Sequence, residues 1–285
     1  MAPLTIAVTG SNGKLGRSVV RRLRAAGHVV WELDQHGERK QEFLRIDLTD
    51  YGQVVDALMG VDDRHSGLDA VVHLAAIPAP GLQPDATTFH NNMAATYNVF
   101  QACRRAGIKR VVYASSETVL GLPFDEAPPY IPVDEEYAAR PESTYSLVKH
   151  LEEQMAIEFT RWDPQLSITA LRFSNVMDPE DYAEFPSFDA DPMLRKWNLW
   201  GYIDGRDGAQ AVELALEAAP GFDRFIIAAA DTVMSQSSAR LAAQVFPGVE
   251  LVKDVGEHET LLSIDRARRV LGFDPQHSWR DHAEP

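Results

Sequence analysis

The chain of 285 residues has a single cysteine, Cys103, so it can form neither an internal disulfide bond nor a cysteine-based zinc site. It also lacks any apolar run approaching the ~20 residues that span a bilayer. No charged leader with a long apolar stretch precedes the first expected strand. These absences favour the reducing cytoplasm and no membrane association. Cys103 lies in an apolar-patterned helix, and we expect it to pack in the core.

Positive charge is also scarce, because 42 acidic residues face 27 lysines and arginines and give a formal net charge of -15. Such a surface repels phosphate backbones, so we expect no nucleic-acid partner. One anionic cofactor can still bind where a helix N-terminus offers free N–H groups. No group of His, Asp or Glu has metal-ligand spacing, and we expect no metal.

The first 175 residues alternate short apolar strands with amphipathic helices, which predicts a parallel sheet covered on both faces and doubly wound. Strands are expected at 4–10, 28–34, 43–50, 68–76, 109–116 and 166–175. Helices are expected at 15–27, 51–60, 87–107 and 143–155.

The pattern changes after about residue 175. Residues 177–200 are rich in Asp, Pro and aromatics and have no clear period. Helices are expected at 202–219 and 236–246, with a strand at 224–230 between them. We therefore expect a nucleotide-binding core of residues 1–175, continued by about 202–230. Residues 176–201 and 231–285 are expected to form a small C-terminal substrate-binding lobe.

The stretch "VTGSNGKLG" places Gly10, Gly13 and Gly16 between the first strand and the first helix. Glycine permits the tight turn and a close approach, and the helix N-terminus then faces a diphosphate. A glycine triplet alone is a weak signal. Here a strand precedes it, a helix follows it, and an acidic residue ends the second strand.

That acidic residue is Asp34, which lies 24 positions after Gly10. A carboxylate there accepts hydrogen bonds from adenosine ribose hydroxyls and repels the 2′-phosphate of NADP, so NAD is favoured. The alternative is a solvated strand end. His36, Arg39 and Lys40 follow closely and could soften the preference. Asp47 ends the expected third strand, within reach of an adenine.

The stretch "STYSLVKHLEEQM" puts Tyr145 and Lys149 four residues apart, on one face of a helix. A free tyrosine has a pKa near 10, and a nearby ammonium lowers that pKa and makes the phenol a better base. The buried side of this helix is expected to consist of Leu147, Leu151 and Met155. In a purely structural alternative, Glu152 pairs with Lys149.

Read in order, several segments resemble the extended short-chain dehydrogenase/reductase superfamily, in its NAD-dependent epimerase/dehydratase group. The segments are "TGSNGKLG", "HLAA", "NNMAAT", "ASSETVLG", "PESTYSLVK", "RFSNVMDP", "YIDGRDGAQA" and "RRVLGFDP". The resemblance covers nearly the whole chain and implies a Rossmann fold with bound NAD. The residues it implies at the cofactor are Gly10, Asn12, Gly13, Leu15, Gly16, Asp34, Asp47, Leu48, Leu74, Ala75, Ala76, Asn92, Tyr145 and Lys149.

The resemblance also implies a catalytic triad of Ser116, Tyr145 and Lys149, with Ser115 the less favoured hydroxyl. Tyr145 would remove the proton of a substrate hydroxyl while hydride passes to NAD+, and Lys149 would tune Tyr145 and hold the nicotinamide ribose. The substrate contacts it implies are Ser116, Glu117, Tyr145 and Asn175. His73 is expected to be a packed histidine.

Three functions remain open. A dehydrogenase acting on a sugar, sugar acid or similar polyhydroxy compound leads, because the short chain resembles uronate dehydrogenases in layout. The alternatives are a nucleotide-sugar 4-epimerase and a non-catalytic NAD-sensing regulator. Dehydration is not expected, since only Glu117 stands where 4,6-dehydratases carry an Asp–Glu pair.

The residues of a uronate carboxylate clamp are not visible in the sequence. Pro78, Glu117 and Ala183 stand where uronate dehydrogenases have Ser, Asn and Arg. Arg195 or Lys196 could substitute, but a solvated loop charge is the favoured interpretation. Trp197 and Trp200 could floor a sugar site or cap the core, and the core is slightly favoured.

The family resemblance further implies a homodimer through a four-helix interface. The helices involved would be those near 88–106 and 144–161. Ala94 and Ala95, taken as surface residues, would allow the two copies to approach closely.

Overall fold

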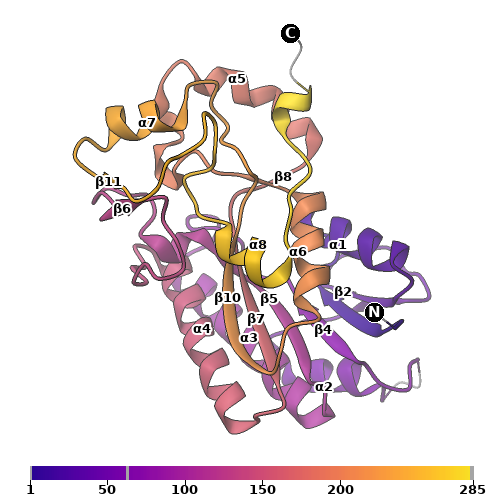
Figure 1. Ribbon diagram of the computed structural model, residues 1–285. Helices are drawn as coiled ribbons and strands as arrows, with labels where there is room; N and C mark the ends of the chain where they lie inside the picture. Colours follow the sequence, from indigo (N-terminus) through magenta and orange to yellow (C-terminus); the bar gives the residue numbers. More distant parts are fainter. Residues whose placement is uncertain (1, 62–63, 283–285) are drawn as a thin grey trace.

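The computed structural model describes residues 2–61 and 64–282, and its centre is a seven-stranded sheet in which every neighbouring pair is parallel (Figure 1). The strand order is β10-β7-β5-β4-β1-β2-β3. The bounds are β1 Thr5–Thr9, β2 Val29–Asp34, β3 Phe43–Arg45, β4 Ala70–His73, β5 Arg110–Ser116, β7 Ser167–Phe173 and β10 Gly221–Ile227.

Helices cover both faces of this sheet. On one face α1 (Lys14–Ala25) packs against α6 (Gly205–Ala215), which also contacts α8 (Asp265–Leu271). On the other face α3 (Asp85–Ala106) packs between α2 (Tyr51–Met59) and α4 (Thr144–Trp162). The order of strands reverses beside β1, so the expected α/β, doubly wound parallel fold is confirmed.

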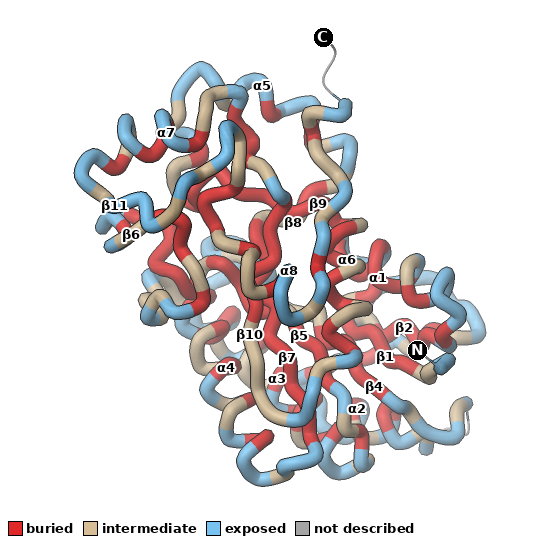
Figure 2. Tube along the Cα trace, viewed as in Figure 1, coloured by how far each residue is buried: buried red, intermediate tan, exposed pale blue. Residues whose placement is uncertain are grey.

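The pleat of the strands divides the core into two parts. Ile6 and Val8 of β1 point into a cluster shared with α1 and α6, whereas Ala7 points into a cluster shared with α2, α3 and α4. Both faces of the central strands are therefore buried, as Figure 2 shows. Cys103 is fully buried in the second cluster, as expected. This explains why the strands read as continuous apolar runs rather than as alternating ones.

Shorter elements lie beyond the carboxyl edge of the sheet, in the upper part of Figure 1. They include α5 (Phe185–Phe188), α7 (Ser238–Val245), β8 (Val176–Met177) and β9 (Ile203–Asp204). The aperiodic stretch 177–200 forms short helical segments, two of which begin with Pro after an Asp N-cap, at Pro179 and Pro192. β6 (Tyr130–Ile131) pairs in parallel with β11 (Glu250–Leu251). The chain between β5 and α4 thus contributes to this upper part, and the division into two lobes at residue 175 stays a prediction.

The third strand was expected at 43–50, but β3 covers only Phe43–Arg45. It ends at Arg45, because the Asp47 carboxylate turns the chain by accepting from the Thr49 backbone N–H at 2.9 Å and from its hydroxyl at 2.8 Å. The helix α8 was missed altogether. Its seven residues give too few turns for a periodic pattern to emerge.

The expected orientation of α4 was wrong. Leu147 is 40% exposed, and Leu151 and Met155 are only partly buried. The face against the sheet instead carries Tyr145, Val148, Lys149, Glu152, Glu153 and Ala156. Charged side chains can occupy a buried face when each finds a partner. The Glu153 carboxylate accepts from Arg172 on β7 at 2.8 and 2.7 Å, and from the Ser115 hydroxyl at 2.7 Å.

Two further expectations concern surfaces. Ala95 was expected on the surface of α3, but it is buried. Ala94 is partly exposed.

Within residues 2–61 and 64–282, the structure contains no helix that is both long enough and apolar enough to cross a membrane.

The buried Glu153–Arg172 pair should dominate the stability of α4 on the sheet. We expect Glu153→Gln to lower the free energy of unfolding at pH 7 by roughly 3–5 kcal/mol, because it leaves the Arg172 guanidinium buried without its counter-charge. Glu158→Gln is the matched control, since it removes an exposed pair with Arg161 from the same helix and should change stability by less than about 0.5 kcal/mol. Urea unfolding of both variants measures the difference. Equal losses would contradict the assignment.

Candidate active site

A cavity of about 1100 Å³ lies along the carboxyl edge of the sheet. Its walls come from the turn after β1, the ends of β2 and β5, and the loops that follow β4 and β7. With the exception of Asn92, all the residues that the sequence places at the cofactor or the substrate line it. They are Gly10, Asn12, Gly13, Leu15, Gly16, Asp34, Asp47, Leu48, Leu74, Ala75, Ala76, Ser116, Glu117, Tyr145, Lys149 and Asn175.

The turn after β1 leaves no space for a side chain at Gly10 or Gly16. Gly10 has a positive φ of 65°, and a Cβ there would lie 2.7 Å from the Ala75 backbone nitrogen. A Cβ on Gly16 would lie 2.1 Å from the Gly10 carbonyl oxygen. Gly13 caps α1 without any side-chain hydrogen bond, so the first N–H groups of the helix are left for a ligand. This cradle fits the diphosphate of a dinucleotide.

Asp34 ends β2 at the rim of the same cavity. Its carboxylate accepts from the backbone N–H groups of Asn12 at 3.0 Å and His36 at 3.1 Å. These bonds fix the orientation of the carboxylate and leave it further lone pairs for ribose hydroxyls. Lys40 does not soften its charge directly, because its ammonium lies 2.8 Å from the Glu32 carboxylate.

Asn92 is buried behind the cavity wall rather than in it. Its side-chain carbonyl accepts from the Ile77 backbone N–H at 2.8 Å, and its amide donates to the Ile77 carbonyl at 3.0 Å. Ile77 and its neighbour Pro78 line the cavity. Asn92 therefore holds the loop after β4 in place.

The start of α4 places Tyr145 in the first turn of the helix. A capping box fixes this start, since the Ser143 side chain accepts from the Ser146 backbone N–H at 3.1 Å and the Ser146 hydroxyl accepts from the Ser143 N–H at 2.8 Å. On β5, Ser116 accepts from the Thr118 N–H at 3.2 Å and from the Thr118 hydroxyl at 3.0 Å. Both lone pairs of Ser116 are thus used, so its hydroxyl can act as the donor, either to Tyr145, whose pKa it lowers, or to a substrate oxygen.

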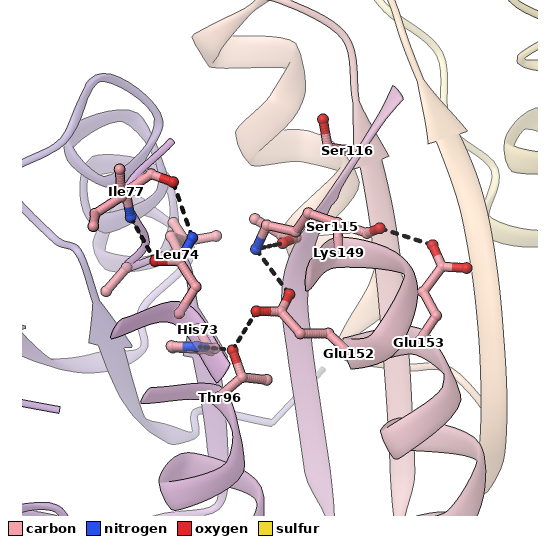
Figure 3. A network of polar contacts seen from close by, with 12 residues as sticks. His73, Leu74, Ile77, Thr96, Ser115, Ser116, Lys149, Glu152 and Glu153 are labelled. Atoms are coloured by element: carbon pink, nitrogen blue, oxygen red, sulfur yellow. Dashed lines mark hydrogen bonds and ion pairs between the residues drawn. The ribbon is translucent and has the colours of Figure 1, made fainter. Parts of the chain in front are cut away.

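Ser115 is committed elsewhere, because its hydroxyl donates to Glu153. Ser116 is consequently the hydroxyl that faces the cavity together with Tyr145. Figure 3 shows the two serines pointing in different directions, with Ser115 directed toward Glu153.

Lys149 is buried and donates to the Ala114 carbonyl and to the Glu152 carboxylate, both at 2.9 Å. Burial disfavours its charge, but the Glu152 carboxylate, together with Tyr145 and Glu153, more than offsets this and raises the pKa of Lys149. Burial also raises the pKa of Tyr145; Lys149 and the Ser116 hydroxyl pull it down, while Glu152 pushes it further up. The ion pair that the sequence offered only as a structural alternative is therefore present beside the triad.

The ion pair continues into a chain of buried polar groups (Figure 3). The Thr96 hydroxyl donates to Glu152 at 2.7 Å, and it lies 3.1 Å from Nε2 of His73. Nδ1 of His73 lies 2.8 Å from the Thr9 hydroxyl. Burial, together with the Lys149 charge, lowers the pKa of His73 to about 3, so this packed histidine is neutral. Thr9 and Thr96 lie in the quoted segments "TGSNGKLG" and "NNMAAT", but neither was singled out from the sequence.

Glu117 occupies the end of the cavity beyond Ser116. Its Oε1 accepts from the Asn198 amide at 3.2 Å, and its Oε2 has no hydrogen-bond partner among the described residues. Burial raises the pKa of Glu117 to about 7, although hydrogen-bond donors and the Arg195 guanidinium oppose the rise. A buried, half-satisfied carboxyl beside the triad is suited to a substrate hydroxyl.

Arg195 is not a solvated loop charge. It is buried, its guanidinium lies 5.1 Å from the Phe188 ring centroid and 5.0 Å from that of Trp197, and it donates to the Gly201 carbonyl at 3.0 Å. It packs behind Trp197, which lines the cavity. Trp200, in contrast, is fully buried in the core. The two tryptophans thus have different positions.

No group of three or more His, Cys, Asp or Glu side chains in the described parts of the chain is arranged to hold a metal ion. The arrangement has the parts for acid–base chemistry on a hydroxyl group beside a bound dinucleotide. These parts are a cradle for phosphates, a carboxylate for ribose, and a serine, tyrosine and lysine at one wall.

Solved structures share this fold over nearly their whole length. A short-chain dehydrogenase/reductase superfamily protein from Agrobacterium tumefaciens, crystallised with bound NAD, is 25% identical, with a TM-score of 0.73 over 97% of this chain and 94% of that one. A mutated uronate dehydrogenase has a TM-score of 0.69 and 22% identity over 98% of this chain and 85% of its own. The likeness to the second protein shows the fold alone.

Curated relatives match a shorter segment. The UDP-glucose 4-epimerase of Drosophila melanogaster is 29% identical over 198 residues, which make up 61% of this chain and 54% of the relative. The enzyme of the same name from Bacillus subtilis is 26% identical over 187 residues, or 60% and 52%. The matched segment thus spans about half the length of these relatives.

The model of one family, described as the NAD dependent epimerase/dehydratase family, matches residues 6–228. This segment runs from β1 through β10 and contains the glycine cradle, Asp34, Ser116, Tyr145 and Lys149. The chain therefore belongs to the NAD dependent epimerase/dehydratase family, as its motifs predict.

Proposed function

We propose that the protein is an NAD-dependent oxidoreductase that removes hydride from a hydroxyl-bearing carbon of a small sugar, sugar acid or related polyhydroxy compound. The observation that carries this proposal is the placement of Ser116, Tyr145 and Lys149 in the wall of the cavity that also holds the glycine cradle and Asp34.

The cofactor would be held by residues of the first half of the chain. The diphosphate would lie on the N–H groups that follow Gly10 and Gly13, and the adenosine ribose on Asp34. Asp34 presents a negative charge where NADP would carry its 2′-phosphate, which favours NAD. Bound NAD+ supplies a hydride acceptor and a positive ring charge.

The residues of this chain then handle the proton. The Ser116 hydroxyl donates to the substrate oxygen and orients it, because its own lone pairs are taken by Thr118. Tyr145 takes the proton from that oxygen as the base. Lys149 keeps one of its three N–H donors beyond those given to Ala114 and Glu152, and this donor is suited to a ribose hydroxyl.

A small substrate is favoured over a nucleotide sugar by the charges in the cavity wall. Among the described residues that line it, the only lysines or arginines are Lys14, beside the glycine turn, and Lys149. Lys14 pairs with Asp181 at 2.6 Å. The end of the cavity near Glu117 thus has no lysine or arginine in its lining to bind the diphosphate of a nucleotide sugar. The similarity to UDP-glucose 4-epimerases supports the 4-epimerase alternative instead.

The proposal is tested by following absorbance at 340 nm with the purified protein, NAD+ and a panel of free sugars, uronic acids and nucleotide sugars. A sustained rise with one free sugar or sugar acid is the expected result. Chromatography of the nucleotide-sugar reactions is the second readout. Interconversion of a nucleotide sugar without net absorbance change would overturn the proposal in favour of a 4-epimerase. No turnover of any compound would favour a regulator.

Tyr145→Phe serves as the control for mechanism in the same assay. Loss of the acid–base group should lower kcat by at least about 100-fold while NAD+ binding, measured by calorimetry, changes little. Near-normal turnover in this variant would refute Tyr145 as the base.

Glu117 is proposed to accept a hydrogen bond from a substrate hydroxyl. Because the pKa of Glu117 is raised to about 7, its carboxyl loses its proton near neutral pH, and the charged form is the stronger acceptor. We expect the substrate KM of the wild type to fall as the pH rises through about 7. Glu117→Gln should raise KM roughly tenfold or more and remove this inflection. An unchanged KM profile in the variant would refute the contact.

A homodimer through α3 and α4 is proposed on the exposed apolar side chains that these helices carry. Tyr97 is 47% exposed, Leu147 40% and Trp162 49%, although nearby apolar residues of the same helices are buried. We expect sedimentation at micromolar concentration to give a dimer, and Leu147→Arg to give a monomer. The exposed Val270→Arg on α8 is the control. A wild-type monomer would refute the interface.

A further inference from the structure

We propose that Glu152 is a positioning residue that tunes the net charge beside Tyr145: it holds Lys149 in place, offsets part of the Lys149 charge, and so helps the buried Tyr145 to stay protonated until the oxidised cofactor is bound. The inference rests on the proposed function only in taking Tyr145 as the base. Glu152 itself does not line the cavity and touches neither the substrate nor the cofactor site.

The geometry around Glu152 is that of a carboxylate. Its side chain has no solvent exposure, and each of its oxygens accepts one bond, Oε2 from the Lys149 ammonium at 2.9 Å and Oε1 from the Thr96 hydroxyl at 2.7 Å. A buried acid with two donors aimed at its two oxygens is favoured in the charged form. Burial raises the pKa of Glu152, whereas Lys149 and Thr96 lower it, and on this geometry we take the pair as ionised, with a net charge near zero.

The charged state of Glu152 fixes which of the remaining polar groups donate and which accept. Because Thr96 gives its proton to Glu152, its oxygen accepts from the Nε2–H of His73. Nδ1 of His73 then accepts from the Thr9 hydroxyl, which itself accepts from the backbone N–H groups of Leu74 and Ala75. From Thr96 to Thr9 every donor has an acceptor, and the chain ends at Leu74 and Ala75, which line the cavity.

The consequence for Tyr145 is electrostatic. Burial is the largest cause that raises the pKa of Tyr145; Lys149 lowers that pKa, and the Glu152 carboxylate acts against Lys149 from the same helix. Other charged or titratable groups face this region from the elements around α4. They are Glu153 on α4, Glu117 in the turn after β5, Tyr113 on β5, His73 on β4, Arg172 on β7 and Arg224 on β10. Of these, Glu153 and Arg172 pair with one another and largely cancel.

The test uses the protein without cofactor. Tyrosinate absorbance at 295 nm is titrated from pH 7 to 10.5, and the difference between each protein and its Tyr145→Phe version isolates Tyr145. In the wild type we expect the Tyr145 midpoint to lie above the ordinary value of a free tyrosine, about 10. In Glu152→Gln we expect the Tyr145 midpoint to lie roughly one pH unit or more lower, because a unit charge in a buried site has been removed. Lys149 keeps its hydrogen bond to the Ala114 carbonyl in this variant.

Two variants separate charge from geometry. Glu158→Gln removes the same charge from an exposed position of α4 and should leave the Tyr145 midpoint unchanged. Glu152→Asp displaces the carboxylate by one methylene group but keeps its charge, so it should restore a midpoint close to that of the wild type. A purely structural role predicts instead that Asp and Gln disturb the titration alike.

Once a substrate has been found, the acidic limb of the kcat/KM profile should move to lower pH by the same amount in Glu152→Gln. An unchanged Tyr145 midpoint in folded Glu152→Gln would overturn the proposal. If that variant does not fold, a wild-type Tyr145 midpoint below that of a free tyrosine would overturn the proposal alone. The titration without cofactor needs no substrate. It therefore tests the role of Glu152 even if no compound in the substrate panel is turned over.

Discussion

The placement of α4 on the sheet depends on buried charges that find their partners across the chain. Arg172 on β7 and Glu153 on α4 are each 1% exposed in their side chains, and they meet through two hydrogen bonds. Burying one of these ions alone would be prohibitive, so the pair fixes both the rotation and the height of α4. Tyr145 and Lys149 lie on the same face of that helix, so the placement of α4 determines where their side chains lie. The active-site wall is therefore held by charge pairing as much as by apolar packing.

The rest of the site follows from the parallel sheet. In a doubly wound sheet the loops at the carboxyl ends of the strands converge at one edge, and the turn after β1 opens onto the reversal point between β1 and β4. The Gly10 backbone approaches Ala75 there, so closely that a methyl group would collide. Residues that are far apart in sequence, such as Asp34 and Asn175, thereby reach one cavity.

Sequence reasoning succeeded where the signal is local. The strands are apolar throughout because they are buried on both faces, and the glycine spacing reflects contacts within one turn. It failed for the rotation of α4, since apolar residues lie on both sides of this helix and the periodicity alone does not tell which side packs. The sequence favoured the Leu147 side. The structure buries the charged side, because Arg172 and Thr96 supply partners that no local pattern reveals.

The same limitation explains Arg195 and Glu152. The sequence favoured a solvated loop charge for Arg195, since a charged residue is exposed unless it is paired, and it offered the pair of Glu152 with Lys149 only as a structural alternative. Arg195 is stacked between two aromatic rings, and Glu152 is closed in by a lysine and a threonine. According to the proposal for Glu152, its burial beside Lys149 affects the protonation of Tyr145. A base that stands beside a nearly neutral ion pair remains protonated in the empty site, and the positive ring of NAD+ then becomes the main charge that favours its ionisation. Base strength would thus appear only where a hydride acceptor is present.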